Sequence, residues 1–184
     1  TRLQSTLVGK DLSILAKGLP EGKVIAQEGW VDSKIIPETE SYIKGKFDLL
    51  LERPDKTHLL VDLKISQPHD DKIEKYKTQL NAYKYALENP KEGRAYKITK
   101  IGLLIFYPEN VSFKEGEALV HFPPKWLEVP LDQDGFIKFI REIDKLLAGE
   151  VPSESKTCKW CQYRHVGETL SHLKEEPAQD EIPF

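Results

Sequence analysis

Two stretches in the first half of the chain alternate between apolar and polar residues. Residues 45–52 read GKFDLLLE and residues 58–66 read HLLVDLKIS. Period-two alternation is typical of half-buried strands, and the intervening sequence RPDKT at 53–57 is typical of a hairpin loop. The pattern therefore predicts an antiparallel hairpin. Folding it symmetrically about Asp55 places Leu49 opposite Val61, and the neighbouring pairs follow: Phe47 opposite Leu63 and Leu51 opposite Leu59.

The same register puts two carboxylates, Asp48 and Asp62, across from each other on the second face of the hairpin. Opposed residues have Cα atoms roughly 4.5–5.5 Å apart, and like charges there are destabilising. The pair therefore needs a cation or a proton. Lys64 shares this face and supplies part of the compensation, and Mg²⁺ or Mn²⁺, which prefer oxygen ligands, would supply more. A register slip of two residues would make the pair diagonal but keep all three side chains on one face.

The other periodicities predict the remaining elements. They are a helix over 3–17 interrupted at Gly9, a strand over 24–31 continued by 34–36, a helix from Ile73 to Asn89-Pro90 capped by Asp70 or Asp71, a buried strand over 97–107, short strands over 118–122 and 126–131, and a helix over 136–147 ended by Gly149.

This order of elements predicts an α/β fold with a mixed central β-sheet flanked by helices. We expect one domain over 1–150, followed by a cysteine-containing segment and a flexible tail over 151–184. The composition, 39% hydrophobic and 31% charged, is that of an ordinary globular protein, and no apolar run is long enough to span a bilayer. Without a signal peptide, the expected location is the cytoplasm. The chain begins at Thr1 and contains no methionine, so we expect it to be part of a longer protein.

Three short motifs occur in order on these elements. They are Gly45-x-x-Asp48, Asp62-x-Lys64 at the end of the next strand, and Gln79-x-x-x-Tyr83 on the helix that follows. Together they resemble the PD-(D/E)XK nuclease superfamily, and the helix motif resembles its RecB-like branch, to which CRISPR-associated exonucleases are related. The resemblance implies a restriction-endonuclease-like core and a metal-dependent, exonuclease-like hydrolysis of DNA phosphodiester bonds in repair, recombination or defence.

The resemblance also assigns roles to residues. Asp48, Asp62 and the backbone carbonyl of Leu63 would ligate one or two Mg²⁺ or Mn²⁺ ions, with Glu28 as an additional candidate ligand. An exposed strand carboxylate is the alternative interpretation of Glu28. Lys64 would lie beside the attacking water or the phosphate and stabilise developing negative charge.

On the helix, Gln79 and Tyr83 are four residues apart and therefore share a face. The resemblance implies that they position the DNA strand, whereas a core role is the alternative for Tyr83. The net charge of −3 is not that of a typical nucleic-acid binder, but only a local groove has to be basic. The expected partners are DNA and a helicase or other recombination or defence proteins, without a membrane.

The only cysteines, Cys158 and Cys161, form a C-x-x-C-x-Tyr segment with Tyr163. In the RecB-like branch, a similar segment helps to hold an iron–sulfur cluster, but this chain lacks the further cysteines that a four-thiolate cluster needs. Zn²⁺ bound by Cys158, Cys161, His165 and His172 has suitable ligand types. A vestigial pair, a zinc site and a cluster completed by other residues all stay open.

Two rivals to the nuclease hypothesis belong to other functional classes. The first is a catalytically inactive nuclease-fold module that binds DNA or assembles a complex. The second is a zinc-stabilised interaction domain. A hairpin ending in D-x-K also occurs in unrelated enzymes.

Overall fold

The computed structural model describes residues 7–69 and 71–172 of the chain. Its elements are β1 (Lys23–Asp32), β2 (Lys44–Glu52), β3 (His58–Ile65), α1 (Asp71–Glu88), β4 (Ile98–Phe106), β5 (Asn110–Lys114), β6 (Glu117–His121), β7 (Pro124–Val129), α2 (Gln133–Ala148) and α3 (Lys159–His172). The chain divides into two compact units, Thr1–Asp144 and Lys145–Phe184, and the whole sheet lies in the first. No helix in the described ranges is long and apolar enough to cross a membrane.

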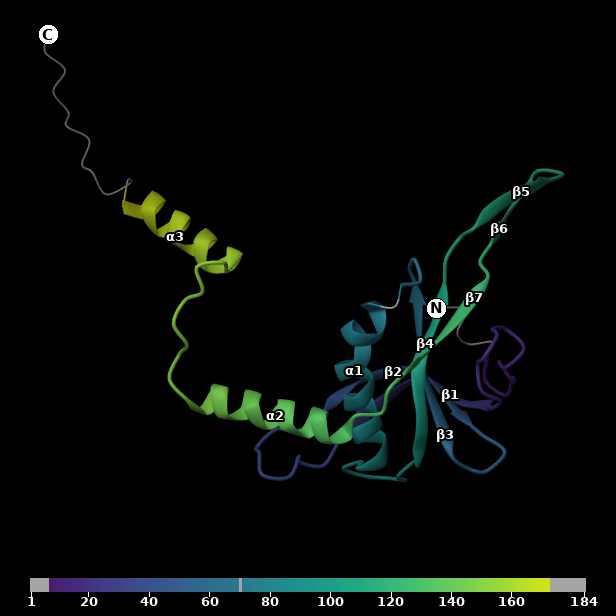
Figure 1. The fold of residues 1–184 in the computed structure, drawn as a ribbon, viewed down its shortest axis with the longest axis horizontal. Coiled ribbons are helices and arrows are strands. Elements are labelled where there is room, and N and C mark those ends of the chain that lie inside the picture. Colours follow the sequence, from purple (N-terminus) through teal and green to yellow (C-terminus); the bar gives the residue numbers. More distant parts are fainter. Residues whose placement is uncertain (1–6, 70, 173–184) are drawn as a thin grey trace, which may run out of the picture. The chain divides into compact units, whose positions relative to one another are not determined.

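Five strands form one mixed sheet in the order β1-β2-β3-β4-β7 (Figure 1). Strands β3 and β4 are parallel, and every other neighbouring pair is antiparallel. Helix α1 makes the crossover between the two parallel strands, as such a connection requires. The predicted fold class, a mixed sheet flanked by helices, is confirmed.

The central hairpin has the predicted register. Leu49 pairs with Val61 and Leu51 pairs with Leu59, and a five-residue turn connects the two strands. The expected pair of Phe47 with Leu63 is wrong, because the β2–β3 ladder ends at Leu49 and Val61. Phe47 instead pairs with Gly29 of β1, where a Cβ atom would lie 2.3 Å from the Phe47 ring. Glycine at position 29 therefore makes room for the aromatic ring.

Helix α1 and the N-terminal segment cover opposite faces of the sheet. The cluster under α1 joins its Leu80, Ala86 and Leu87 to strand residues such as Leu50 and Ile101. The cluster on the other face includes Leu12, Ala16 and Leu19 together with Leu49, Leu51, Leu59 and Val61. Strand β4 contributes to both clusters, as predicted for a strand buried on two sides.

The N-terminal segment is not the expected helix within residues 7–17, which form turns. Gly9 and Gly18 have positive φ angles of 82° and 84°, a conformation that ends regular helix. The backbone of Gly9 and Lys10 hydrogen-bonds to Val24 instead. The regularly spaced leucines therefore pack as an irregular strap on the sheet.

Other expectations differ in detail. Residues 34–36 do not continue β1, because Lys34 N–H donates to the Asn89 carbonyl after α1. The strand near 118–122 is β6, and it pairs with the unexpected β5 in a separate exposed ribbon (Figure 1). Helix α3 was also not predicted. The start of the expected N-terminal helix, the cap candidate Asp70 and the tail 173–184 lie outside the described residues.

His58, at the beginning of β3, is a buried histidine with 2% of its surface exposed. Its ring packs edge-on against the Tyr96 ring, with 5.0 Å between the two ring centroids. Neither ring nitrogen of His58 has a hydrogen-bond partner in the described part of the chain. Burial lowers the pKa of His58 below its usual value of 6.5. Above about pH 6.5 the His58 ring is neutral in both the folded and the unfolded chain, and the free energy of unfolding is not reduced. As the pH falls from there toward the lower folded-state pKa, the unfolded chain binds a proton more readily than the folded one, so the fold loses stability.

We expect the His58→Phe variant to lose less stability than wild type between pH 7 and pH 5, because it has no imidazole to protonate. Urea unfolding at several pH values measures this slope, and His121→Phe is the matched control at an exposed histidine. Parallel slopes for wild type and His58→Phe would show that His58 does not titrate in this range.

Candidate active site

Asp48 lies where β2 and β3 stop pairing through their backbones. Its Oδ2 accepts a hydrogen bond of 2.7 Å from the backbone N–H of Leu63. This bond takes the place of the next ladder contact beyond Leu49 and Val61. The second oxygen of Asp48, Oδ1, makes no hydrogen bond to any residue that the structure describes. One oxygen therefore fixes the carboxylate and the other stays available.

Asp62, one residue before Leu63, is only 4% exposed. Its Oδ2 lies 2.7 Å from the Nζ of Lys64. Burial raises the pKa of Asp62 above its usual value, Lys64 counteracts this in part, and the negative charge of Asp48 raises the pKa further. The two carboxylates therefore repel each other, although the expected Asp48–Asp62 ladder pair is absent because the β2–β3 ladder ends at Leu49 and Val61.

The lysine of the D-x-K motif is held between two partners. Burial works against its charged form, yet the Asp62 carboxylate outweighs this effect and raises the pKa of Lys64. On its other side, Nζ lies 4.6 Å from the centroid of the Tyr76 ring, a cation–π contact. This role of Tyr76 was not predicted from the sequence. The signal for it was its spacing, because Tyr76 lies three residues before Gln79 and seven before Tyr83 and therefore shares their face of the helix.

Gln79 and Tyr83 meet on α1 as expected from their spacing. Gln79 Nε2 donates to the Tyr83 hydroxyl at 3.3 Å. The Tyr83 ring lies against Gly45 of β2, where a Cβ atom would come within 2.8 Å of it. Glycine at position 45 thus allows α1 to approach the beginning of β2, three residues before Asp48. This contact gives a physical reason for the glycine in the first motif.

Glu28 of β1 lies between the pairs Gln27–Leu49 and Gly29–Phe47, next to Asp48 in the ladder. Its backbone has a positive φ of 53°, which is unusual for a residue other than glycine. Its carboxylate is paired with Lys46. The structure thus places Glu28 beside the hairpin but directs it to a lysine, and its role as a metal ligand stays a prediction.

A family model of the PD-(D/E)XK nuclease superfamily matches residues 12–166 of this chain of 184 residues. The chain belongs to the PD-(D/E)XK nuclease superfamily. This confirms the resemblance at the level of the superfamily. The match does not extend to a branch, so the RecB-like assignment stays a prediction.

Among solved structures, the crystal structure of SSO0001 is similar to this PD-(D/E)XK chain. The two sequences are 15% identical, and the TM-score is 0.43 over 77% of this chain. This chain spans 59% of the length of SSO0001. No curated protein matches the sequence.

Members of the PD-(D/E)XK superfamily typically use divalent metals such as Mg²⁺. Magnesium retains several waters and needs only one or two carboxylates together with substrate phosphates. Asp48 and Asp62 supply the carboxylates, the carbonyl of Leu63 would add a third oxygen, and the repulsion between the acids favours a cation. The described residues hold no group of three or more acidic, histidine or cysteine side chains arranged around one ion. The buried Asp62, whose pKa the charge of Asp48 raises, fits an ion held by these two carboxylates.

The cysteine pair lies at the beginning of α3, in the second unit. Hydrogen bonds from the backbone and thiol of Cys161 lower the pKa of Cys158, and the same thiol contact raises the pKa of Cys161. His165 directs Nδ1 to Glu168 at 3.0 Å and Nε2 to Glu154. The ring nitrogens of His165 thus face carboxylates, and the His172 side chain lies outside the described part. The predicted zinc or iron–sulfur site stays a hypothesis.

The raised pKa of Asp62 predicts a cost in stability at the active site. Its folded-state pKa is higher than the unfolded value, so ionisation destabilises the fold as the pH rises from about 4. We expect metal-free Asp62→Asn to be more stable than wild type at neutral pH, with a difference that shrinks toward pH 4. Urea unfolding in EDTA measures it, and Asp134→Asn is the exposed control. An Asp62→Asn variant less stable at pH 7 would assign Asp62 a structural role.

Proposed function

We propose that this protein is a metal-dependent nuclease that hydrolyses phosphodiester bonds of DNA at Asp48, Asp62 and Lys64. Membership in the PD-(D/E)XK superfamily supports a nuclease. The single observation that carries the proposal is the pair of carboxylates, Asp48 and Asp62, at the end of the β2–β3 ladder. The Nζ of the charged Lys64 lies 2.7 Å from Oδ2 of the buried Asp62.

The chemistry follows from the properties of these side chains. A divalent ion held by Asp48, Asp62 and the Leu63 carbonyl would polarise the phosphate and lower the pKa of an attacking water. The bond from Leu63 N–H fixes the orientation of Asp48. Lys64 stays protonated because of Asp62, and its ammonium group stabilises the negative charge that develops on the phosphate. Tyr76 restricts the movement of this ammonium group.

The finer proposal is an exonuclease of the RecB-like type that acts on DNA in repair, recombination or defence. Gln79 and Tyr83 support it, because their polar atoms meet on α1 beside the beginning of β2. At this position they can hold the DNA strand. We also propose a helicase or a similar protein as a partner. The cytoplasm is the proposed compartment, because Cys158 and Cys161 are free thiols.

Cleavage of labelled single-stranded and duplex DNA and of RNA, with Mg²⁺, Mn²⁺ or EDTA, tests the proposal. We expect Asp48→Asn, Asp62→Asn and Lys64→Gln each to reduce metal-dependent cleavage at least about a hundredfold. The matched controls Asp134→Asn and Lys138→Gln change exposed residues of α2 and should keep full activity. Unfolding curves of all variants show whether a loss of activity reflects a loss of fold.

The rivals predict other results. A catalytically inactive module would bind DNA without cleaving it under any of these conditions, and calorimetry would show no Mn²⁺ binding that depends on Asp48. Cleavage that survives in Asp62→Asn would place the active centre elsewhere.

A further inference from the structure

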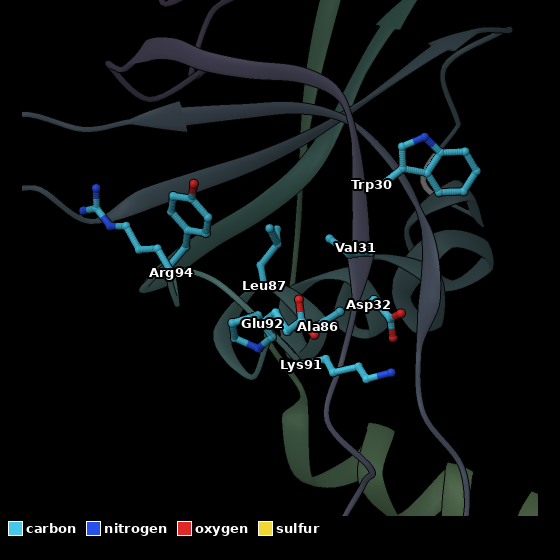
Figure 2. Close-up of a pocket in the computed structure, with 10 residues that line it drawn as sticks. Trp30, Val31, Asp32, Ala86, Leu87, Lys91, Glu92 and Arg94 are labelled. Atoms are coloured by element: carbon cyan, nitrogen blue, oxygen red, sulfur yellow. The ribbon is translucent and has the colours of Figure 1, made fainter.

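A hollow of about 420 Å³ lies at the edge of the sheet, between the end of β1 and the segment that follows α1. Its volume is within the range of small-molecule sites. Figure 2 shows Val31, Ala86 and Leu87 between Trp30 on one side and Arg94 on the other. None of these residues belongs to the carboxylate site described above.

One side of the hollow carries an exposed aromatic ring, and the other carries an arginine stacked on a partly buried tyrosine. Trp30 is 74% exposed, which is unusual for such a large apolar side chain on a strand. On the other side, the Arg94 guanidinium lies 5.5 Å from the centroid of the Tyr96 ring. Aromatic faces and stacked arginines are the groups on which nucleic-acid bases stack.

The polar groups around the hollow are not satisfied by the protein. In the described part of the chain, Lys91 and Arg94 form no ion pair within 4.0 Å. Oδ1 of Asp32 is buried and has no hydrogen-bond partner there. Two cations can bind phosphate, and a carboxylate oxygen can accept a hydrogen bond from the edge of a base. This combination fits a nucleotide.

The hollow lies next to the candidate active site in the β1–β2 ladder. Trp30 pairs with Lys46, Val31 with Gly45, and Asp32 with Lys44. Asp48 follows Gly45 by three residues, which is about 10 Å along an extended strand. A stacked strand advances about 3.4 Å per nucleotide, so the separation corresponds to roughly three nucleotides.

We propose that this hollow binds one nucleotide of a single-stranded nucleic acid, a few nucleotides away from the phosphodiester bond that is cleaved at Asp48 and Asp62. The proposal rests on the proposed nuclease function for the position of the cut. Trp30 supplies the stacking surface, Arg94 and Lys91 hold phosphate, and Asp32 accepts a hydrogen bond from the base.

Binding can be measured without cleavage, by anisotropy of a fluorescein-labelled 12-nucleotide strand in EDTA. We expect Trp30→Ala to weaken binding about tenfold, the typical effect of losing one stacked base. Arg94→Gln should also weaken binding and lower the salt slope by about 0.7. The matched control is Trp160→Ala, which removes another highly exposed tryptophan (82%) from α3. It should leave the affinity unchanged.

A second readout follows Trp30 directly. The chain has three tryptophans, so a Trp126→Phe, Trp160→Phe double variant leaves Trp30 as the only indole. Its fluorescence should be quenched by the strand. In cleavage assays, Trp30→Ala should raise KM for long strands while kcat stays the same, and it should not affect a dinucleotide that is too short to reach the hollow.

Unchanged affinity in both Trp30→Ala and Arg94→Gln, or an equal loss in Trp160→Ala, would overturn the proposal while leaving the nuclease function intact. A lysine-rich peptide that binds wild type and loses affinity in Asp32→Asn would identify the hollow as a peptide site instead. Absence of cleavage with a Trp30-dependent affinity for the strand would contradict the nuclease function but support the hollow.

Discussion

The hydrogen bond from the Leu63 N–H to the Asp48 carboxylate determines the geometry of the candidate site. It forms where two strands separate, so a side chain replaces the backbone acceptor that an unbroken ladder would supply. A backbone donor moves less than a side-chain donor, and it orients one oxygen of Asp48 while leaving the other available. Because Leu63 follows Asp62 directly, the same bond holds Asp48 beside the backbone next to Asp62, and the charge of Asp48 raises the pKa of Asp62.

This arrangement is unfavourable for the fold and useful for chemistry. Asp62 is buried beside another acid, and its raised pKa shows that the ionised form is disfavoured there. Lys64 offsets only part of this effect, although it lies in direct contact. A cation between the carboxylates would favour the ionised form of Asp62 and so lower its pKa. Acids with strongly shifted pKa values are common at functional sites. If Asp48 and Asp62 had only a structural role, neutral residues in their place would make the fold more stable.

The sequence was informative where a local pattern corresponds directly to burial. The alternation around Asp55 predicted the register of the hairpin, and with it the pairing of Leu49 with Val61 and of Leu51 with Leu59. Helical spacing predicted the contact of Gln79 with Tyr83. The N-terminal leucines were misinterpreted because an irregular strap can bury residues at the same spacing as a helix. Strand β5, whose residues are all exposed, was not predicted.

The bond at Asp48 was not predictable either, because strand alternation assumes that the ladder continues. A separate irregularity lies in β1, where Glu28 has a left-handed backbone. Ala26 and Val31 both face α1, although strict alternation would put them on opposite sides. The strand changes its phase at Glu28, so Val31 enters the core and Trp30, which alternation would have buried, is exposed. Glu28 lies between the Gln27–Leu49 and Gly29–Phe47 pairs, beside Asp48 and two residues before the exposed Trp30, so the carboxylate site and the neighbouring hollow share this part of the β1–β2 ladder.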